Sequence, residues 1–182
     1  MSSFSVFFIQ TMCTVVLKND NSSQTVRSIY KHVKPKYRTM YQMDCYENEK
    51  QWLTKLQGTD IVPELLLTVD DARVLVTKYA GEPVIASTLP DDWEQQRDHI
   101  LVTLKTANCR HNDIKPSEIL VQEGTIRLID FGWASPLDQP IPKNYPTCLG
   151  CKWRCPTGLN DEYSFNKSVD SVLRDNSNSH NV

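Results

Sequence analysis

The stretch HNDIKPSEILVQEGTIRLIDFGWAS, residues 111–135, decides the fold that we expect for this chain. Within it, Ile119 to Gln122 and Thr125 to Ile129 are rich in β-branched and apolar residues, a composition typical of paired strands. The two residues between these runs, Glu123-Gly124, suit a tight turn, because glycine readily adopts positive φ. The stretch therefore predicts a β-hairpin.

Two aspartates flank this hairpin. Asp113 precedes the first strand and Asp130 follows the second, so the hairpin would bring both carboxylates to the same edge of the fold. Paired carboxylates at loop edges can hold a hard cation and orient a hydroxyl group. An ordinary surface hairpin whose terminal acids are solvated is the alternative interpretation.

The same stretch resembles the catalytic core of protein kinases, in which H-R-D-x-K-x-x-N is followed by a hairpin and D-F-G. His111-Asn112-Asp113 takes the place of H-R-D, Lys115 the place of the lysine, and Asp130-Phe131-Gly132 is an intact D-F-G. By this resemblance Asp113 would accept or orient the proton of the substrate hydroxyl, and Lys115 would neutralise the moving phosphoryl group. Asp130 would hold Mg²⁺ or Mn²⁺ against the ATP phosphates, and His111 would pack under the D-F-G turn.

Three departures from the family pattern affect the chemistry. Glu118 stands where the family has its metal-binding asparagine; it keeps an oxygen ligand but adds a negative charge, and it is our second candidate metal ligand. Asn112 replaces the usual arginine, so we expect no control through an arginine that grips a phosphorylated loop. No glycine occurs before Gly58, so the glycine-rich loop that covers the ATP phosphates is missing.

The N-terminal part is predicted to contain three strands, at Phe4–Ile9, Cys13–Leu17 and Thr25–Val33. In the third, Ser28-Ile29-Tyr30-Lys31 resembles the family's V-A-I-K, which makes Lys31 the candidate for the ATP phosphates, with Lys34 and Lys36 as competitors.

A helix is predicted from Met40 to Leu56 by its apolar spacing, and Gly58 would end it. The resemblance makes Glu49 on this helix the best partner for Lys31, with Glu47 second. A glutamate on a solvated helix face is the alternative.

Two further strands, Val62–Leu67 and Arg73–Thr77, are predicted around a turn at Asp70-Asp71. The residues that follow them resemble the kinase hinge, where backbone groups would bind the adenine: Lys78, Tyr79 and Ala80. A plain surface loop is the alternative.

The C-terminal part is predicted to be mainly helical, with one helix from Leu89 to Asn108 and another from about Glu162 to Leu173. Asp161 resembles the family aspartate that braces the catalytic loop. Between these helices, Thr157 occupies the place of the A-P-E glutamate. Three cysteines nearby could instead begin a zinc site: Cys148, Cys151 and Cys155.

A formal net charge of −2 over 182 residues offers no general attraction to nucleic acid or to an anionic membrane. The apolar run from Phe4 to Leu17 is too short and too polar for a membrane span. Six cysteines without a recognisable secretory leader fit reduced thiols, so we expect a cytoplasmic protein.

Together these features predict an α+β chain with a minimal bilobal protein-kinase-like fold: a small β-rich N-lobe at about residues 1–77, a hinge at about 78–82 and a truncated helical C-lobe at about 83–174. Residues 175–182 are expected to form a disordered tail. The implied activity is ATP- and Mg²⁺-dependent transfer of the γ-phosphoryl group to a hydroxyl of a protein Ser/Thr, a sugar or another small molecule. The alternative is a pseudokinase, a nucleotide-binding or scaffold module without useful catalysis.

Overall fold

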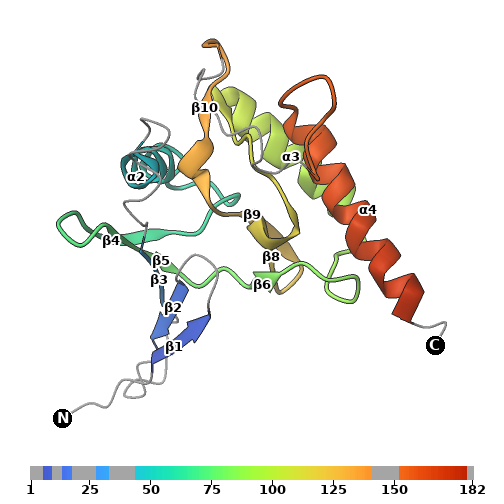
Figure 1. Cartoon of the computed structure of the whole chain (residues 1–182), viewed down its shortest axis with the longest axis horizontal. Helices are drawn as coiled ribbons and strands as arrows, with labels where there is room; N and C mark the ends of the chain where they lie inside the picture. Colours follow the sequence, from blue (N-terminus) through green and yellow to red (C-terminus); the bar gives the residue numbers. More distant parts are fainter. Residues whose placement is uncertain (1–5, 10–13, 18–27, 33–43, 141–151, 180–182) are drawn as a thin grey trace.

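The computed structural model (Figure 1) describes residues 6–9, 14–17, 28–32, 44–140 and 152–179 of the chain. For the strands before residue 44 it describes the backbone and its pairing. An N-terminal lobe built on a sheet is followed by a C-terminal lobe in which two helices pack together. The predicted α+β bilobal architecture is therefore confirmed.

The N-terminal lobe is a five-stranded antiparallel sheet with the strand order β1-β2-β3-β5-β4. Its strands are β1 (Val6–Ile9), β2 (Thr14–Leu17), β3 (Ser28–His32), β4 (Leu65–Val69) and β5 (Val74–Lys78). All five predicted strands are present. The fourth is displaced toward the C-terminus from its predicted position at Val62–Leu67, because Ile61 and Val62 are buried ahead of it and serve the core.

Helix α2 (Cys45–Lys55) packs against the sheet and against the turn that follows Asp130. The prediction that this helix starts at Met40 was wrong, because Asp44 is its N-cap. The Asp44 carboxylate accepts the backbone N–H groups of Tyr46 (3.2 Å) and Glu47 (3.3 Å), which satisfies two donors of the first turn. Residues 40–43 lie outside the described residues.

In its described residues, 82–140 and 152–179, the C-terminal lobe has two small sheets, two helices and two short 3₁₀ turns. One sheet has the order β6-β8-β9, and β10 pairs with β7 in the other. The elements are β6 (Glu82–Pro83), α3 (Trp93–Thr106), β7 (Cys109–Arg110), η1 (Pro116–Glu118), β8 (Ile119–Gln122), β9 (Thr125–Leu128), η2 (Phe131–Trp133), β10 (Ser135–Pro136) and α4 (Asp161–Ser179).

The hairpin predicted at the centre of the chain is confirmed. Strands β8 and β9 pair from Ile119 opposite Leu128 to Gln122 opposite Thr125. Both turn residues have left-handed backbones, Glu123 with φ 51° and Gly124 with φ 76°, as a two-residue hairpin turn of the primed type requires. The hairpin brings the backbone at Glu118 and Ile129 together, and the Ile129 N–H donates to the Glu118 carbonyl over 3.1 Å.

The two long helices differ in extent from their predictions. Helix α3 is shorter than Leu89–Asn108: Leu89 belongs to a separate turn on Ile85, and Asn108 has a left-handed backbone with φ 53° that cannot continue the helix. Helix α4 is longer and runs through Ser179, so the predicted tail is helical at residues 175–179. A helix already anchored by buried side chains extends at little cost, even through a segment of modest propensity.

A single hydrophobic core connects the two lobes. It contains Trp52 of α2, Leu75 of β5, Leu104 of α3 and Phe165 of α4, all of them buried. No helix among the described residues is both long and apolar enough to cross a membrane.

Candidate functional site

The loop before the hairpin is anchored by its neighbours in the fold. Asp161, the first residue of α4, accepts the backbone N–H groups of His111 (2.7 Å) and Asn112 (2.9 Å). This is the bracing aspartate that the sequence predicted. His111 is fully buried, its Nε2 donates to the Ile129 carbonyl (2.9 Å), and its ring meets that of Phe131 edge-on at 4.5 Å. His111 is therefore structural, as predicted.

The loop presents Asp113, whose side chain is buried and bound to Lys115. The Nζ of Lys115 donates to Asp113 Oδ2 over 2.6 Å. The other carboxylate oxygen, Asp113 Oδ1, is buried and has no hydrogen-bond partner among the described residues. A buried carboxylate oxygen in this state is poised to accept a proton or hydrogen bond from a molecule that enters the site.

Lys115 also contacts Glu118, the residue in the place of the family's asparagine. Its Nζ lies 3.0 Å from Glu118 Oε1, which also accepts a hydrogen bond from the Ser117 hydroxyl (2.9 Å). Burial lowers the pKa of Lys115, but the surrounding carboxylates of Glu118, Asp113 and Asp130 outweigh it and raise this pKa overall. Lys115 is thus held as a cation between two carboxylates.

Asp130 lies at the other end of the hairpin, in a left-handed conformation with φ 67° and ψ 61°, and is 7% exposed. It lies near enough to Asp113 for the two charges to interact. Burial raises the pKa of Asp113, Lys115 opposes this, and the charge of Asp130 raises it further. The net result is a pKa above the ordinary range of an aspartate, so the two acids share one low-dielectric region of the fold.

The carboxylates of this region suit Mg²⁺ by their chemistry, since Mg²⁺ is commonly held by one or two carboxylates together with substrate phosphates. Among the described residues no group of three or more His, Cys, Asp or Glu side chains is placed to hold a metal ion. The Glu118 carboxylate engages Lys115 and Ser117 instead. The carboxylates therefore suit an ion that takes one or two ligands from the protein and its other ligands from a nucleotide.

Two asparagines that sequence reasoning did not assign to the site hold the turn after Asp130. Asn48 of α2 donates to the carbonyls of Phe131, Gly132 and Ala134. Asn112 of the loop donates to the Trp133 carbonyl. No sequence motif pointed to Asn48, because it lies on a helix at least 83 residues before the carbonyls that it binds. Asn112 was noted only as the replacement of an arginine.

Glu49 faces the core from α2 and is 3% exposed, so it does not lie on a solvated helix face. The alternative Glu47 forms an ion pair with Lys50 over 2.9 Å and is exposed. Lys31 pairs with Leu75 in the sheet, and Leu75 is buried in the core that α2 covers. The side chain of Lys31, like Lys34 and Lys36, lies outside the described residues.

The predicted hinge connects β5 to β6. The backbone N–H of Lys78 donates to the Glu64 carbonyl (2.8 Å), and its side chain is exposed near the Glu64 carboxylate. Tyr79 donates its hydroxyl to Glu82 (2.7 Å), whereas Ala80 is buried. The structure therefore places the three candidates differently: Lys78 is the last residue of β5, inside the sheet, and Ala80 is buried.

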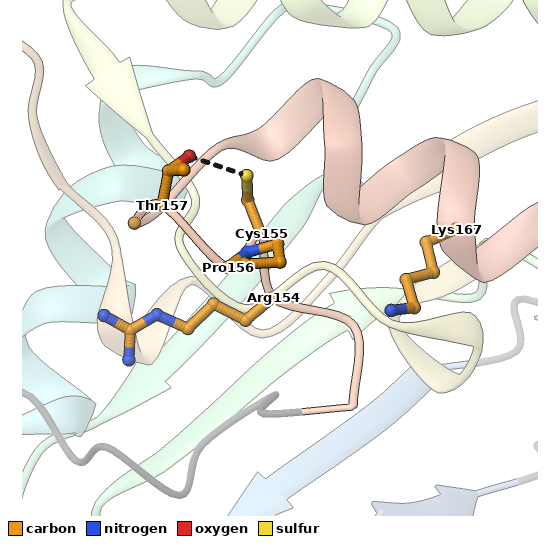
Figure 2. Close-up of a pocket in the computed structure, with 6 residues that line it drawn as sticks. Arg154, Cys155, Pro156, Thr157 and Lys167 are labelled. Carbon is orange, nitrogen blue, oxygen red and sulfur yellow. Dashed lines mark hydrogen bonds between the residues drawn. The ribbon is translucent and has the colours of Figure 1, made fainter.

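A hollow lies between residues 154–158 and α4 (Figure 2). It measures about 590 Å³ and is lined by Arg154, Cys155, Pro156, Thr157, Gly158 and Lys167. The Cys155 sulfur and the Thr157 hydroxyl are 3.1 Å apart, and this hydrogen bond lowers the pKa of the thiol. Of the three cysteines considered for zinc, Cys148 and Cys151 lie outside the described residues, and Cys155 is a free thiol.

Comparison with known proteins bears on the fold. No protein-family model matches the sequence. Serine/threonine-protein kinase mph1 of Schizosaccharomyces pombe is 30% identical over 105 residues, which cover 49% of this chain and 15% of that protein. A crystal structure of the kinase domain of PF14_0431 aligns with a TM-score of 0.63 and 13% identity, covering 93% of this chain and 63% of that chain. This chain spans less than two thirds of either protein, and it has a protein-kinase-like fold.

Proposed function

We propose that the chain is a phosphotransferase that binds ATP with Mg²⁺ or Mn²⁺ and moves the γ-phosphoryl group to a hydroxyl acceptor. The observation that carries this proposal is the state of Asp113. Its carboxylate is buried, one oxygen is fixed by Lys115, and the other has no partner among the described residues. A carboxylate held in this way can orient an incoming hydroxyl and accept its proton.

Each of the surrounding residues has a role in this proposal. Asp130 is the first candidate to hold the metal ion, which when bound neutralises charge on the nucleotide phosphates. Glu118 is the second candidate metal ligand. To bind the ion, its carboxylate would have to give up its contacts with Lys115 and Ser117. Lys115 remains a cation beside Asp113 because its pKa is raised, so it can attract the phosphoryl group in transfer.

The remainder of the nucleotide would lie against the N-terminal lobe. We assign the α- and β-phosphates to Lys31, paired with the buried Glu49, and the adenine to the backbone between Lys78 and Ala80. No glycine precedes Gly58 in the sequence. The phosphates would therefore meet fewer backbone amides than in kinases that carry a glycine-rich loop.

The acceptor is a hydroxyl compound of one of two classes. The name of the S. pombe relative, a serine/threonine-protein kinase, favours a protein side chain for this chain as well. A sugar or another small hydroxyl compound is the second class.

A pseudokinase is the second candidate function, and the contacts of Lys115 favour it. Its Nζ lies within 3.0 Å of both the Asp113 and Glu118 carboxylates, which already neutralise much of the charge that a phosphoryl group would meet. On this reading the fold would bind a nucleotide or a partner without turnover.

A thermal-unfolding titration with MgATP tests the proposal. A ligand that binds only the folded protein stabilises it by RT ln(1 + [L]/Kd), so a hundredfold excess over Kd should add about 2.7 kcal/mol. Asp130→Ala should remove most of this gain, and Asp138→Ala, at an exposed position on the same segment, should retain it.

Transfer of labelled phosphate to a panel of Ser/Thr peptides and sugars then separates the two functions. MgATP stabilisation with transfer supports the phosphotransferase, and stabilisation without transfer supports the pseudokinase. An unchanged melting curve would reject nucleotide binding altogether.

A further inference from the structure

Two carboxamide side chains reach four consecutive backbone carbonyls immediately after Asp130. Asn48 Nδ2 donates toward the carbonyls of Phe131 (3.1 Å), Gly132 (3.0 Å) and Ala134 (2.9 Å). Asn112 Nδ2 donates to the carbonyl between them, that of Trp133 (2.8 Å), and to the Ser135 hydroxyl (2.9 Å). All of these residues of the turn are buried.

These bonds are needed because of the conformation of the turn. Asp130 is left-handed and η2 is a single 3₁₀ turn, in which the Phe131 carbonyl accepts the backbone N–H of Ala134 (3.0 Å). A buried carbonyl without a donor costs free energy comparable to a lost hydrogen bond. The two amides supply further donors from outside the turn, and these donors hold the turn in the shape that sets the Asp130 carboxylate.

The two asparagines come from different elements, each next to a residue of the candidate site. Asn48 precedes Glu49 on α2, and Asn112 precedes Asp113 in the loop braced by α4. The contact of α2 with the turn is also close: a Cβ at Gly132 would lie 3.2 Å from the Cβ of Cys45. Movement of α2 therefore disturbs the turn directly.

We propose that Asn48 and Asn112 are positioning residues that form an amide clamp, holding the turn after Asp130 in the conformation that presents this carboxylate beside Asp113. The catalytic consequence rests on the proposed function. Because amides carry no charge, the clamp requires neither a phosphorylated residue nor a particular protonation state. It thereby couples the placement of α2 to the geometry of the metal-binding acid.

The test uses isosteric changes in the full chain. Asn48→Asp and Asn112→Asp keep the shape of the side chain, but a carboxylate cannot donate and would face the carbonyls with a negative charge. Asparagine and aspartate both tolerate the left-handed backbone at residue 112, where φ is 71°.

The matched control is Asn108→Asp. Asn108 is also left-handed, with φ 53°, but its side-chain oxygen accepts the backbone N–H groups of Leu137 (3.1 Å) and Asp138 (3.3 Å). An aspartate there preserves both bonds, so the same chemical change should have little effect.

The first readout is amide hydrogen exchange without nucleotide. Both clamp variants should exchange at least about tenfold faster at residues 131–135, the change expected for the loss of one or two hydrogen bonds. Helix α3 should exchange as in the wild type. Wild-type exchange at residues 131–135 in a folded variant would overturn the clamp, and so would an equal acceleration across α3, which would indicate general destabilisation.

The second readout is the MgATP concentration dependence of activity. We expect the KM for MgATP to rise at least about fivefold in both clamp variants, because Asp130 is no longer held, and to be unchanged in Asn108→Asp. An unchanged KM with faster exchange would remove the positioning role. If Asn48→Asp does not fold, Asn48→Ala removes the donor without adding charge and carries the same expectations.

The two proposals fail separately. If the wild type neither binds MgATP nor transfers phosphate, the proposed function is lost, while the exchange experiment still decides whether the clamp exists.

Discussion

At the scale of single residues, the candidate site is a concentration of buried charge that costs the fold stability. Asp113 has a raised pKa, first because it is buried and then because Asp130 is near, although Lys115 works against both effects. An acid whose folded pKa is raised binds its proton more tightly in the folded state. Its ionisation therefore removes stability as pH rises from the ordinary aspartate pKa of about 3.9 through the raised value, and the loss persists at neutral pH.

Asp113→Asn should accordingly raise the free energy of unfolding at neutral pH. The amide oxygen still accepts the Lys115 bond, but the buried charge is gone. Near about pH 4 the advantage should shrink, because the wild-type carboxyl is then protonated. Urea unfolding of both proteins at the two pH values measures this, with Asp138→Asn as the exposed control. Equal stabilities at neutral pH would show that the carboxylate is fully compensated in the fold.

The sequence located most of these residues because their motifs are local. Asp113, Lys115 and Asp130 follow from short motifs at fixed spacing, and Asp161 from the start of a helix. Glu118 was expected beside a metal ion, and in the structure its carboxylate contacts the neighbouring Lys115 and Ser117. Asn48 was missed because its role depends on carbonyls far away in the chain, and only the fold brings these together.

At the scale of elements, the segment between β5 and β6 is fixed by a backbone contact that requires glycine. Gly81 has φ 109°, and a Cβ there would lie 2.1 Å from the Val121 carbonyl oxygen of β8. Glycine alone leaves room for this approach. The candidate hinge is therefore held against the β8–β9 hairpin.

Gly81→Ala should destabilise the protein more than Gly58→Ala does. Both positions have positive φ, which costs an alanine about 1 kcal/mol, but Gly58 has no atom within 4 Å of its built Cβ. The clash with β8 should add about 1–3 kcal/mol at Gly81. Denaturant midpoints of the two variants measure the difference, and equal losses would mean that the hinge can move away from β8 at no cost.

Element boundaries were the least predictable part of the fold. The start of α2 depends on Asp44, whose carboxylate also binds the Arg73 guanidinium across the lobe. Arg73 reaches it from a left-handed position in the β4–β5 turn, and the Tyr46 hydroxyl is bound to Asp70 (2.6 Å) in the same turn. Burial, followed by the bond to Asp70, raises the pKa of Tyr46 to about 12. The spacing of apolar residues gives no information on polar contacts between elements, so it could not predict where α2 begins.

At the scale of the whole molecule, both lobes share one hydrophobic core. Trp52 and Leu75 from the N-terminal lobe belong to the same buried cluster as Leu104 and Phe165 from the C-terminal lobe. The strong central motif predicted the bilobal class, but no local pattern predicts how far one core extends across the two lobes. A shared core favours cooperative unfolding of the described chain.

The resulting prediction concerns Phe165, which is fully buried on α4. Phe165→Ala should cost about 3–5 kcal/mol through lost transfer energy and the cavity left behind. If the core is one unit, the loss must appear equally in both lobes. Urea unfolding followed by ¹⁹F resonances of 5-fluorotryptophan reports Trp52 in α2 and Trp93 in α3 separately, and their midpoints should fall together. Leu173→Ala, on the same helix but 42% exposed, should change both midpoints little. If the Trp93 midpoint falls while the Trp52 midpoint is unchanged, the two lobes unfold independently. In a single cooperative unit, the loss of stability would lower both midpoints.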